Sequence, residues 1–131
     1  MSTAAANGPP APKDPDNEHP IPGAWRPMLS AVVQCFVQGD YCLARGVVGV
    51  EPVSAATAEQ IRDYLNEYGA TLVELPDDTW QTSVAQWMET HWEILVDLWT
   101  AEEGQSDLVL DGSVIETSEG PRLIIRLVYV P

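Results

Sequence analysis

The segment LVDLWTAEEGQSDLVL, residues 95–110, decides the fold that this sequence predicts. From Trp92 to Thr100, the two sets of alternate positions differ in polarity, which is typical of a strand with one buried and one wetter face. Glu102-Glu103-Gly104 fits a three-residue hairpin loop in which Gly104 takes the left-handed conformation. The segment therefore predicts an antiparallel hairpin.

The loop length also predicts which residues of the hairpin face one another. The expected pairs are Ala101–Gln105, Trp99–Asp107, Asp97–Val109, Leu95–Asp111, Leu98–Leu108 and Val96–Leu110. Because strand side chains alternate between faces, a slip of one residue would separate the apolar pairs. The hydrophobic pattern therefore supports this register.

A third strand follows in RLIIRLVYV, residues 122–130. A tight turn at Ser118-Glu119 would set Leu110 opposite Leu127 and Asp111 opposite Arg126. Such an opposite-charge pair contributes roughly 0.2–1 kcal/mol. The strand is expected to add four residues to the core: Leu123, Ile125, Leu127 and Tyr129.

Two amphipathic helices are predicted before the hairpin. Residues 27–38 carry apolar side chains at helical spacing, with Pro27 in the first turn and Gly39 at the end. Residues 57–68 carry a second apolar stripe, which Gly69 ends. Thr57 and Gln60 have the spacing of a capping box at its start.

The segments between these elements are read from turn and strand signals. Residues 40–53 are loop-like, and residues 71–75 predict a strand closed by Pro76-Asp77-Asp78. Residues 79–88 fit a helix or a strand, and we favour the strand because two regular strands follow. Together the elements predict an α+β domain, with two N-terminal helices on one face of a mostly antiparallel meander of four or five strands.

The first 22 residues predict a disordered tail rich in proline and alanine, and residues 23–131 a single domain. The chain has 131 residues, six bases and 20 acids, for a formal net charge of −14. The tail holds one lysine and three acids, so five arginines and 17 acids leave −12 on the domain. The acidity therefore belongs to the folded part, where it either serves solubility alone or attracts basic partners.

Several classes of function are disfavoured by composition and motifs. A strongly acidic surface repels nucleic acid and anionic lipid, and no apolar run approaches the ~20 residues of a membrane span. No secretory signal is recognised at the start, so a cytoplasmic location is expected. Cys35 is expected to be a core residue, and a disulfide with Cys42 is not expected.

Motifs for metal, cofactor or nucleophilic chemistry are not recognised either. The acids do not form a calcium-loop motif, and two separated cysteines with two separated histidines do not make a zinc site. His19 is placed in the tail and His91 in a turn, each without an orienting partner. We therefore expect no metal, no cofactor and no catalytic residue, and a non-enzymatic role is favoured over an enzyme.

The words VDLWTAEEGQSDLVL and LVELPDDTW, with GDY after a helix, resemble a family of uncharacterised bacterial proteins known as a domain of unknown function. The resemblance covers about residues 25–131. It implies a bacterial source and a small α+β domain, and it implies no activity. The GDY after an amphipathic helix is also similar to cone-shaped, cystatin-like domains.

One end of the predicted sheet carries a tryptophan ringed by carboxylates: Trp99, Asp97, Asp107, Glu102 and Glu103. An aromatic anchor with charges around it indicates a protein-docking patch, unless the tail or the 40–53 loop covers Trp99. The leading hypothesis is an immunity- or antitoxin-like protein that binds a basic partner.

Two other hypotheses stay open. A cavity between helices and sheet would indicate a small-molecule-binding domain or an enzyme. A homodimer could form through an apolar stripe on the exposed sheet face, which comprises Leu95, Val109, Ile124 and Val128.

Overall fold

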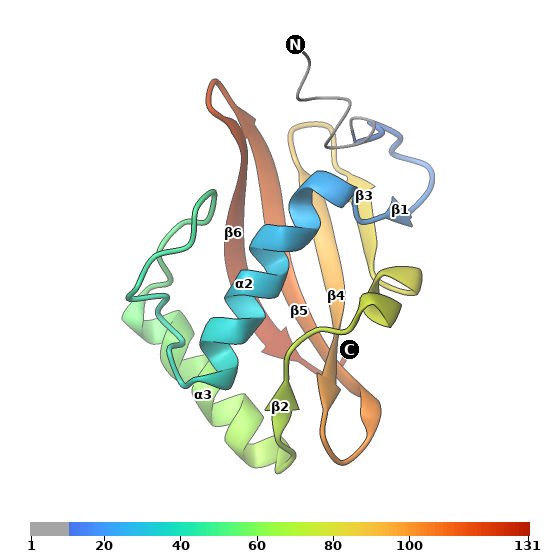
Figure 1. Cartoon of the computed structure of the whole chain (residues 1–131). Helices are drawn as coiled ribbons and strands as arrows, with labels where there is room; N and C mark the ends of the chain where they lie inside the picture. Colours follow the sequence, from blue (N-terminus) through green and yellow to red (C-terminus); the bar gives the residue numbers. More distant parts are fainter. Residues whose placement is uncertain (1–10) are drawn as a thin grey trace.

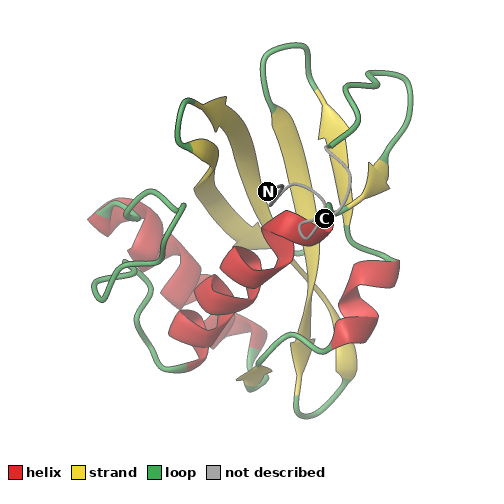
Figure 2. Cartoon of the chain, turned by 45° about the horizontal axis from the view of Figure 1, so that its top comes forward, coloured by secondary structure: helices red, strands yellow, loops and turns green. Residues whose placement is uncertain are grey.

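The computed structural model describes residues 11–131, in which two helices pack on one face of a six-stranded sheet (Figures 1 and 2). The strands are β1 His19–Pro20, β2 Leu72–Val73, β3 Val84–Trp87, β4 Trp92–Thr100, β5 Gly104–Thr117 and β6 Gly120–Tyr129. The α-helices are α2 Arg26–Val37 and α3 Ala55–Tyr68, and the 3-10 helices are η1 Gly23–Trp25 and η2 Asp77–Gln81.

All named strand pairs are antiparallel, in the order β1-β3-β4-β5-β6, and β2 pairs with β4 beside this path. The prediction of an α+β domain is confirmed. The expected count of four or five strands was too low, because β1 lies in the segment assigned to the tail. β2, at 72–73, is shorter than the strand expected at 71–75.

Both helices lie close to their predicted positions. In α2 the apolar stripe that includes Leu29, Val32 and Phe36 is almost fully buried, and Gly39 follows with a φ of 82°. In α3 the prediction of the cap was wrong, because Ser54 and not Thr57 accepts the capping hydrogen bond. The helix consequently begins two residues earlier than expected.

The β4–β5 hairpin confirms the predicted register away from the turn, including Leu95 opposite Asp111. Val96 faces Leu110 and Asp97 faces Val109, as expected, but Trp99 faces Gln105 rather than Asp107. A bulge causes the difference: the Ser106 hydroxyl donates to the carbonyl of Leu98 and accepts from the N–H of Leu108. These bonds replace strand-to-strand bonds and let β5 carry extra residues near the turn.

The predicted turn at Ser118-Glu119 is confirmed, because Thr117 pairs with Gly120, but a second bulge, at Arg126, changes the predicted β5–β6 register farther from the turn. Asp111 pairs with Leu127, and Gly112 pairs with Ile125. Beyond the bulge the alternation reverses, so Val128 is fully buried opposite Leu110, whereas Leu127 and Tyr129 are only partly buried. Val128 therefore drops out of the apolar stripe proposed for a homodimer, and Val109 of that stripe is also buried.

Residues 79–88 combine both of the alternatives that their sequence allows. η2 ends at Gln81, and only 84–87 form a strand. The helical part serves the sheet: the Thr79 hydroxyl donates to the carbonyl of Asp97 at 2.6 Å, and the N–H of Asp97 donates to the Ser83 hydroxyl at 2.9 Å. Both hydroxyl residues are buried, so they satisfy β4 where it lacks a strand partner between β2 and β3.

The ordered domain begins earlier than residue 23. His19 and Pro20 pair with β3, Ile21 is fully buried, and the indole N–H of Trp92 donates to the carbonyl of Pro12. The Lys13 ammonium lies 5.1 Å from the centre of the Trp87 ring. The prediction of disorder was therefore wrong for residues 11–22, and its first ten residues lie outside the described part. Polar contacts to tryptophans hold this proline-rich segment, which composition alone does not reveal.

Candidate functional site

The candidate site comprises the face of the sheet opposite the two α-helices, which we call the open face, and the β4–β5 turn at its end (Figure 1). Alternate residues of β4, from Glu93 through Leu95 and Asp97 to Trp99, point to this face and are partly buried. We call the five predicted residues at the hairpin end (Asp97, Trp99, Glu102, Glu103 and Asp107) the acidic tip. We call His91, Glu93, Asp111, Ser113 and Arg126, toward the other end, the arginine cluster.

Glu102 of the acidic tip is held by the backbone and side chain of one residue. Its carboxylate accepts hydrogen bonds from the N–H of Thr71 at 2.8 Å and from the Thr71 hydroxyl at 2.9 Å. These bonds, the backbone one first, lower the pKa of Glu102 below its ordinary value. Glu102 therefore closes the hairpin turn onto the segment that enters β2 and remains ionised.

Glu103 is held in a similar way by α3. Its two oxygens accept from the Tyr68 hydroxyl at 2.8 and 2.9 Å, and the Thr100 hydroxyl donates at 3.1 Å. The hydrogen bond to Glu103 is the main cause that raises the pKa of Tyr68, so the phenol stays a neutral donor. The same phenol oxygen accepts from the N–H of Asp107 at 3.3 Å.

The two β4 members of the acidic tip make fewer contacts. Asp97 accepts from the Thr82 hydroxyl at 2.5 Å. The Trp99 ring packs beside Gly104, where an added Cβ would lie 3.7 Å from Cζ3. Within residues 11–131 the buried Nε1 atom of Trp99 has no hydrogen-bond partner. Trp99 is thus a half-covered aromatic with exposed carboxylate neighbours.

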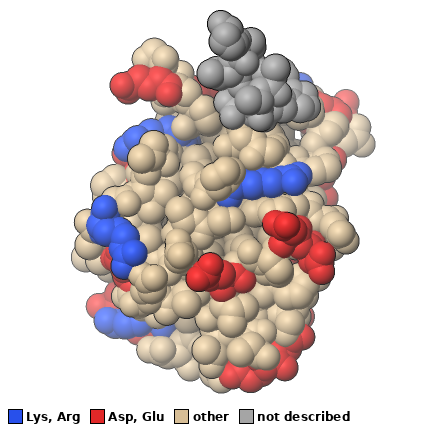
Figure 3. Space-filling model, in the orientation of Figure 1, with Lys and Arg blue, Asp and Glu red and all other residues tan. Residues whose placement is uncertain are grey.

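The structure brings the five predicted residues to one end of the sheet, and more acids border them. Glu67 precedes Tyr68 at the end of α3, and Glu74 follows β2, whereas Asp77 of η2 lines a separate groove with Arg26 and Trp80. Residues 63–121 contain 14 acids and no lysine or arginine. Figure 3 shows carboxylates gathered at the lower end of the molecule, where the β4–β5 turn lies in Figure 1. Sequence reasoning did not include the contribution of α3, because tertiary packing brings Tyr68 to the hairpin.

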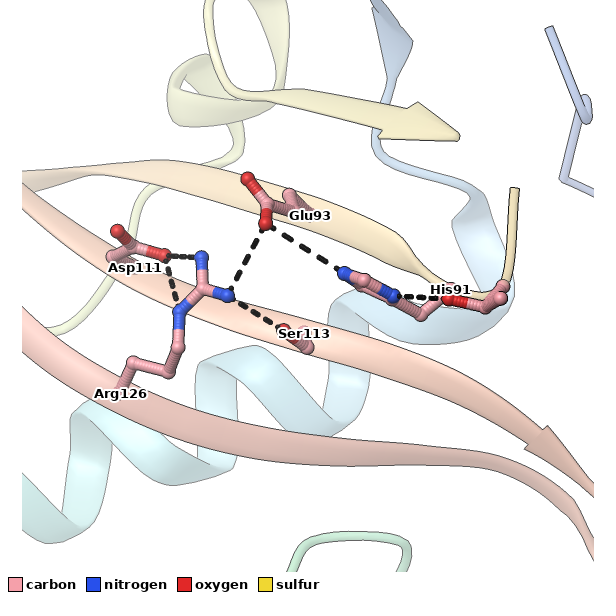
Figure 4. Close-up of polar contacts among 6 residues, drawn as sticks. His91, Glu93, Asp111, Ser113 and Arg126 are labelled. Atoms are coloured by element: carbon pink, nitrogen blue, oxygen red, sulfur yellow. Dashed lines mark hydrogen bonds and ion pairs between the residues drawn. The ribbon is translucent and has the colours of Figure 1, made fainter. Parts of the chain in front are cut away.

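The arginine cluster is the second polar constellation of the open face (Figure 4). Arg126 reaches Asp111 Oδ1 with Nε at 3.2 Å and with Nη2 at 2.5 Å. Its Nη1 atom donates to Ser113 at 3.0 Å and to Glu93 at 3.3 Å. Partial burial alone would lower the pKa of Arg126, but these carboxylates raise it above its ordinary value.

Sequence reasoning predicted the pairing of Arg126 with Asp111, but not the participation of Glu93. The bulge at Arg126, which places this residue in the cluster, was not predicted from the sequence pattern either. His91, expected in a turn, lies 3.6 Å from Glu93 and also contacts the Thr90 hydroxyl at 2.9 Å. The cluster is a charge network centred on a guanidinium, and Ser113 is a partner of Arg126 within it.

Between residues 11 and 131, no group of three or more His, Cys, Asp or Glu side chains could hold a metal ion. No helix in this part combines the length and apolar character needed to cross a membrane. Cys35 is buried and Cys42 exposed, and both are free thiols.

Comparisons with known proteins give a family but no activity. Searches of curated proteins and of solved structures gave no significant match. The model of one family, described as a domain of unknown function, matches residues 33–131, which is most of the chain. The chain therefore belongs to this family, DUF7668.

Proposed function

We propose that this domain is a non-enzymatic binding protein whose acidic tip docks a basic protein. The observation that carries the proposal is how the carboxylates are held. Glu102, Glu103 and Asp97 accept from neutral donors, so their positions are restrained while their charge is not cancelled. A base on a partner would meet carboxylates that are already oriented, which reduces the entropy lost on binding.

Trp99 supplies the apolar part of such an interface. Aromatic residues with a polar surround are enriched among the residues that contribute most to protein association. The ring is partly covered by its own hairpin, which limits its motion before binding. We therefore place the centre of the interface at Trp99, with Asp97 and Asp107 at its border.

The charge distribution favours a cationic protein over other partners. Fourteen acids without a lysine or arginine in 63–121 produce a negative field that attracts cations and repels nucleic acid. Association should be fast and should weaken as salt rises. An immunity- or antitoxin-like protein that neutralises a basic protein would have these properties.

The test is affinity capture from native lysate at low and high salt, repeated with Trp99→Ala/Asp107→Asn. We expect a basic protein that binds at low salt and is lost with the double variant. Glu119→Gln is the matched control, because Glu119 is an exposed acid in the β5–β6 turn. Equal binding by the double variant and the wild type would contradict the proposal.

A second candidate, small-molecule binding, has one observation in its favour. A surface groove of about 500 Å³ runs along the outer side of α2 and is mostly apolar, with Met28 and Val47 in its lining. It lies beside the 45–48 segment rather than between helices and sheet, where the sequence hypothesis placed a cavity. A screen of apolar ligands by thermal shift, compared between wild type and Met28→Gln, would test it.

A further inference from the structure

A hollow of about 230 Å³ opens on the open face at the arginine cluster, two of whose residues line it. Its apolar lining includes Val84, Met88 and Leu95. Three carboxylate residues also line it: Glu18, Glu93 and Asp111. We infer that this hollow takes a lysine or arginine side chain of the basic partner, an inference that rests on the proposed function.

Asp111 and Glu93 each use only one of their two carboxylate oxygens in the arginine cluster. Both contacts from Arg126 to Asp111 go to Oδ1, and Glu93 uses Oε2 for Arg126 and for His91. The second oxygen of each carboxylate points away from Arg126 in Figure 4. Within residues 11–131, Asp111 Oδ2 and Glu93 Oε1 form no hydrogen bond or ion pair. An incoming cation can therefore bind without displacing Arg126.

Glu18 adds the third charge from a different element. It directly precedes β1, and no ion pair of its carboxylate is found among the described residues. The hollow thus has three carboxylates around it against the single guanidinium of Arg126. The surplus negative charge favours a cationic occupant over a neutral or anionic one.

The apolar lining selects the shape of the occupant. Lysine and arginine pack an aliphatic stem on apolar surface and place the charge at its end. Here the stem would contact Leu95 and Val84, which face each other across β4 and β3. A small inorganic cation could not make those contacts, so the hollow suits a side chain better than a metal ion.

A second copy of this chain is a poorer occupant than a basic protein. The open face presents Glu93, Asp97, Asp107 and Asp111, and a copy would bring the same carboxylates against it. Like charges placed together across an interface oppose association. Burial of Val128 also shortens the apolar stripe that a homodimer would use.

The hollow and the acidic tip can bind one partner segment together. Leu95 and Trp99 lie on the same face of β4, four residues apart, which corresponds to roughly 13 Å along a strand. An extended segment with a basic residue at the hollow would reach Trp99 with a residue about four positions away. The partner is therefore expected to carry basic and apolar residues at that spacing.

The experiment is NMR titration of the ¹⁵N-labelled full chain with Nα-acetyl-arginine amide at low salt. The neutral isostere Nα-acetyl-citrulline amide is the ligand control. We expect saturable shifts of the Leu95, Asp111 and Glu18 amides with the arginine compound only. Glu18→Gln should weaken this binding about fivefold, whereas Glu119→Gln should not change it. Glu18 lies outside the arginine cluster, so its variant should leave the fold intact.

The outcomes separate this inference from the proposed function. Shifts confined to the Trp99 indole and its neighbours would overturn the hollow and leave the acidic tip standing. Absence of saturation at the hollow, or equal affinity in Glu18→Gln, would also overturn it. Saturable binding at the hollow, with partner capture unaffected by Trp99→Ala/Asp107→Asn, would support the hollow and remove the acidic tip.

Discussion

The two ends of the open face hold their carboxylates by opposite means. At the acidic tip, the partners of Glu102, Glu103 and Asp97 are hydroxyls and a backbone N–H. In the arginine cluster, Asp111 and Glu93 share one guanidinium. None of the ion pairs found among residues 11–131 involves an acidic-tip residue.

The difference shows how one residue type can serve two purposes on one sheet. One guanidinium offsets part of the charge of the two carboxylates that it positions, so the arginine cluster keeps less negative charge per carboxylate while it joins β4, β5 and β6. A neutral donor positions a carboxylate and leaves its field intact. The acidic tip is consequently both a structural junction and the stronger source of negative potential.

The largest expected effect comes from Gly112→Ala, which should destabilise the sheet at the arginine cluster. A Cβ there would lie 2.8 Å from the carbonyl oxygen of Ile124, so β5 and β6 would have to separate. We expect a loss of about 1–3 kcal/mol in the free energy of unfolding. Urea denaturation measures this loss, and hydrogen exchange should rise along β6 more than at the acidic tip.

Gln105→Ala is the matched control for Gly112→Ala, because Gln105 is exposed on the same strand. It should change stability by less than about 0.5 kcal/mol. If hydrogen exchange in Gly112→Ala rose first at the acidic tip, the tip and the arginine cluster would not be stabilised independently. That result would contradict the contrast drawn between them.

Thr79→Val should destabilise the sheet at the acidic tip, with a smaller loss in the free energy of unfolding. The change removes a hydroxyl that donates to the buried backbone of β4 at Asp97, while shape is nearly conserved. We expect a loss of about 1–2 kcal/mol. Thr82→Val removes a bond to the Asp97 side chain in solvent and should cost less than half as much. Equal losses in the two variants would contradict a special role for the Thr79 hydroxyl.

Arg126→Gln should have a smaller effect than either, because its ion pairs are partly in water. The Arg126 side chain is 36% exposed, and exposed ion pairs contribute little. We expect a loss of about 0.5–1 kcal/mol that shrinks in high salt, measured by urea denaturation. A loss independent of salt would mean that Arg126 acts through packing rather than charge.

The sequence predicted the parts of this fold that local periodicity determines. Helical spacing located α2, and alternation in β4 established the pairing of Val96 with Leu110. The prediction from sequence failed where a bulge shifts the pairing of neighbouring strands, as at Ser106 and Arg126. Such bulges depend on contacts between strands, so the residue pattern within one strand does not predict them.

The candidate site was predicted by composition and only partly by geometry. The residues of the acidic tip were all identified from the hairpin, because the turn places them together. Their partners Tyr68 and Thr71 lie 35 and 31 residues away in sequence, so their contacts could not be inferred. The hollow was missed because Glu18 was assigned to a disordered tail.

The smallest expected effect, a pH titration of Glu102, tests the comparison most directly. Its pKa lies below the ordinary value of 4.5, first because of the hydrogen bond from the Thr71 N–H. A folded-state pKa below the unfolded value means that the contact stabilises the fold above about pH 4.5. That contribution is lost as the pH falls from this value through the lower folded-state pKa.

The Thr71 amide proton, followed by NMR against pH, reports this titration. Its midpoint should lie below 4.5 and should disappear in Glu102→Gln. Added salt should move the midpoint little, because a hydrogen bond and not a neighbouring cation holds the carboxylate. A midpoint at or above 4.5 would mean that the Glu102 carboxylate is not held in solution. The acidic tip would then offer a partner mobile charges, and the contrast with the arginine cluster would no longer explain why a basic protein docks at the tip.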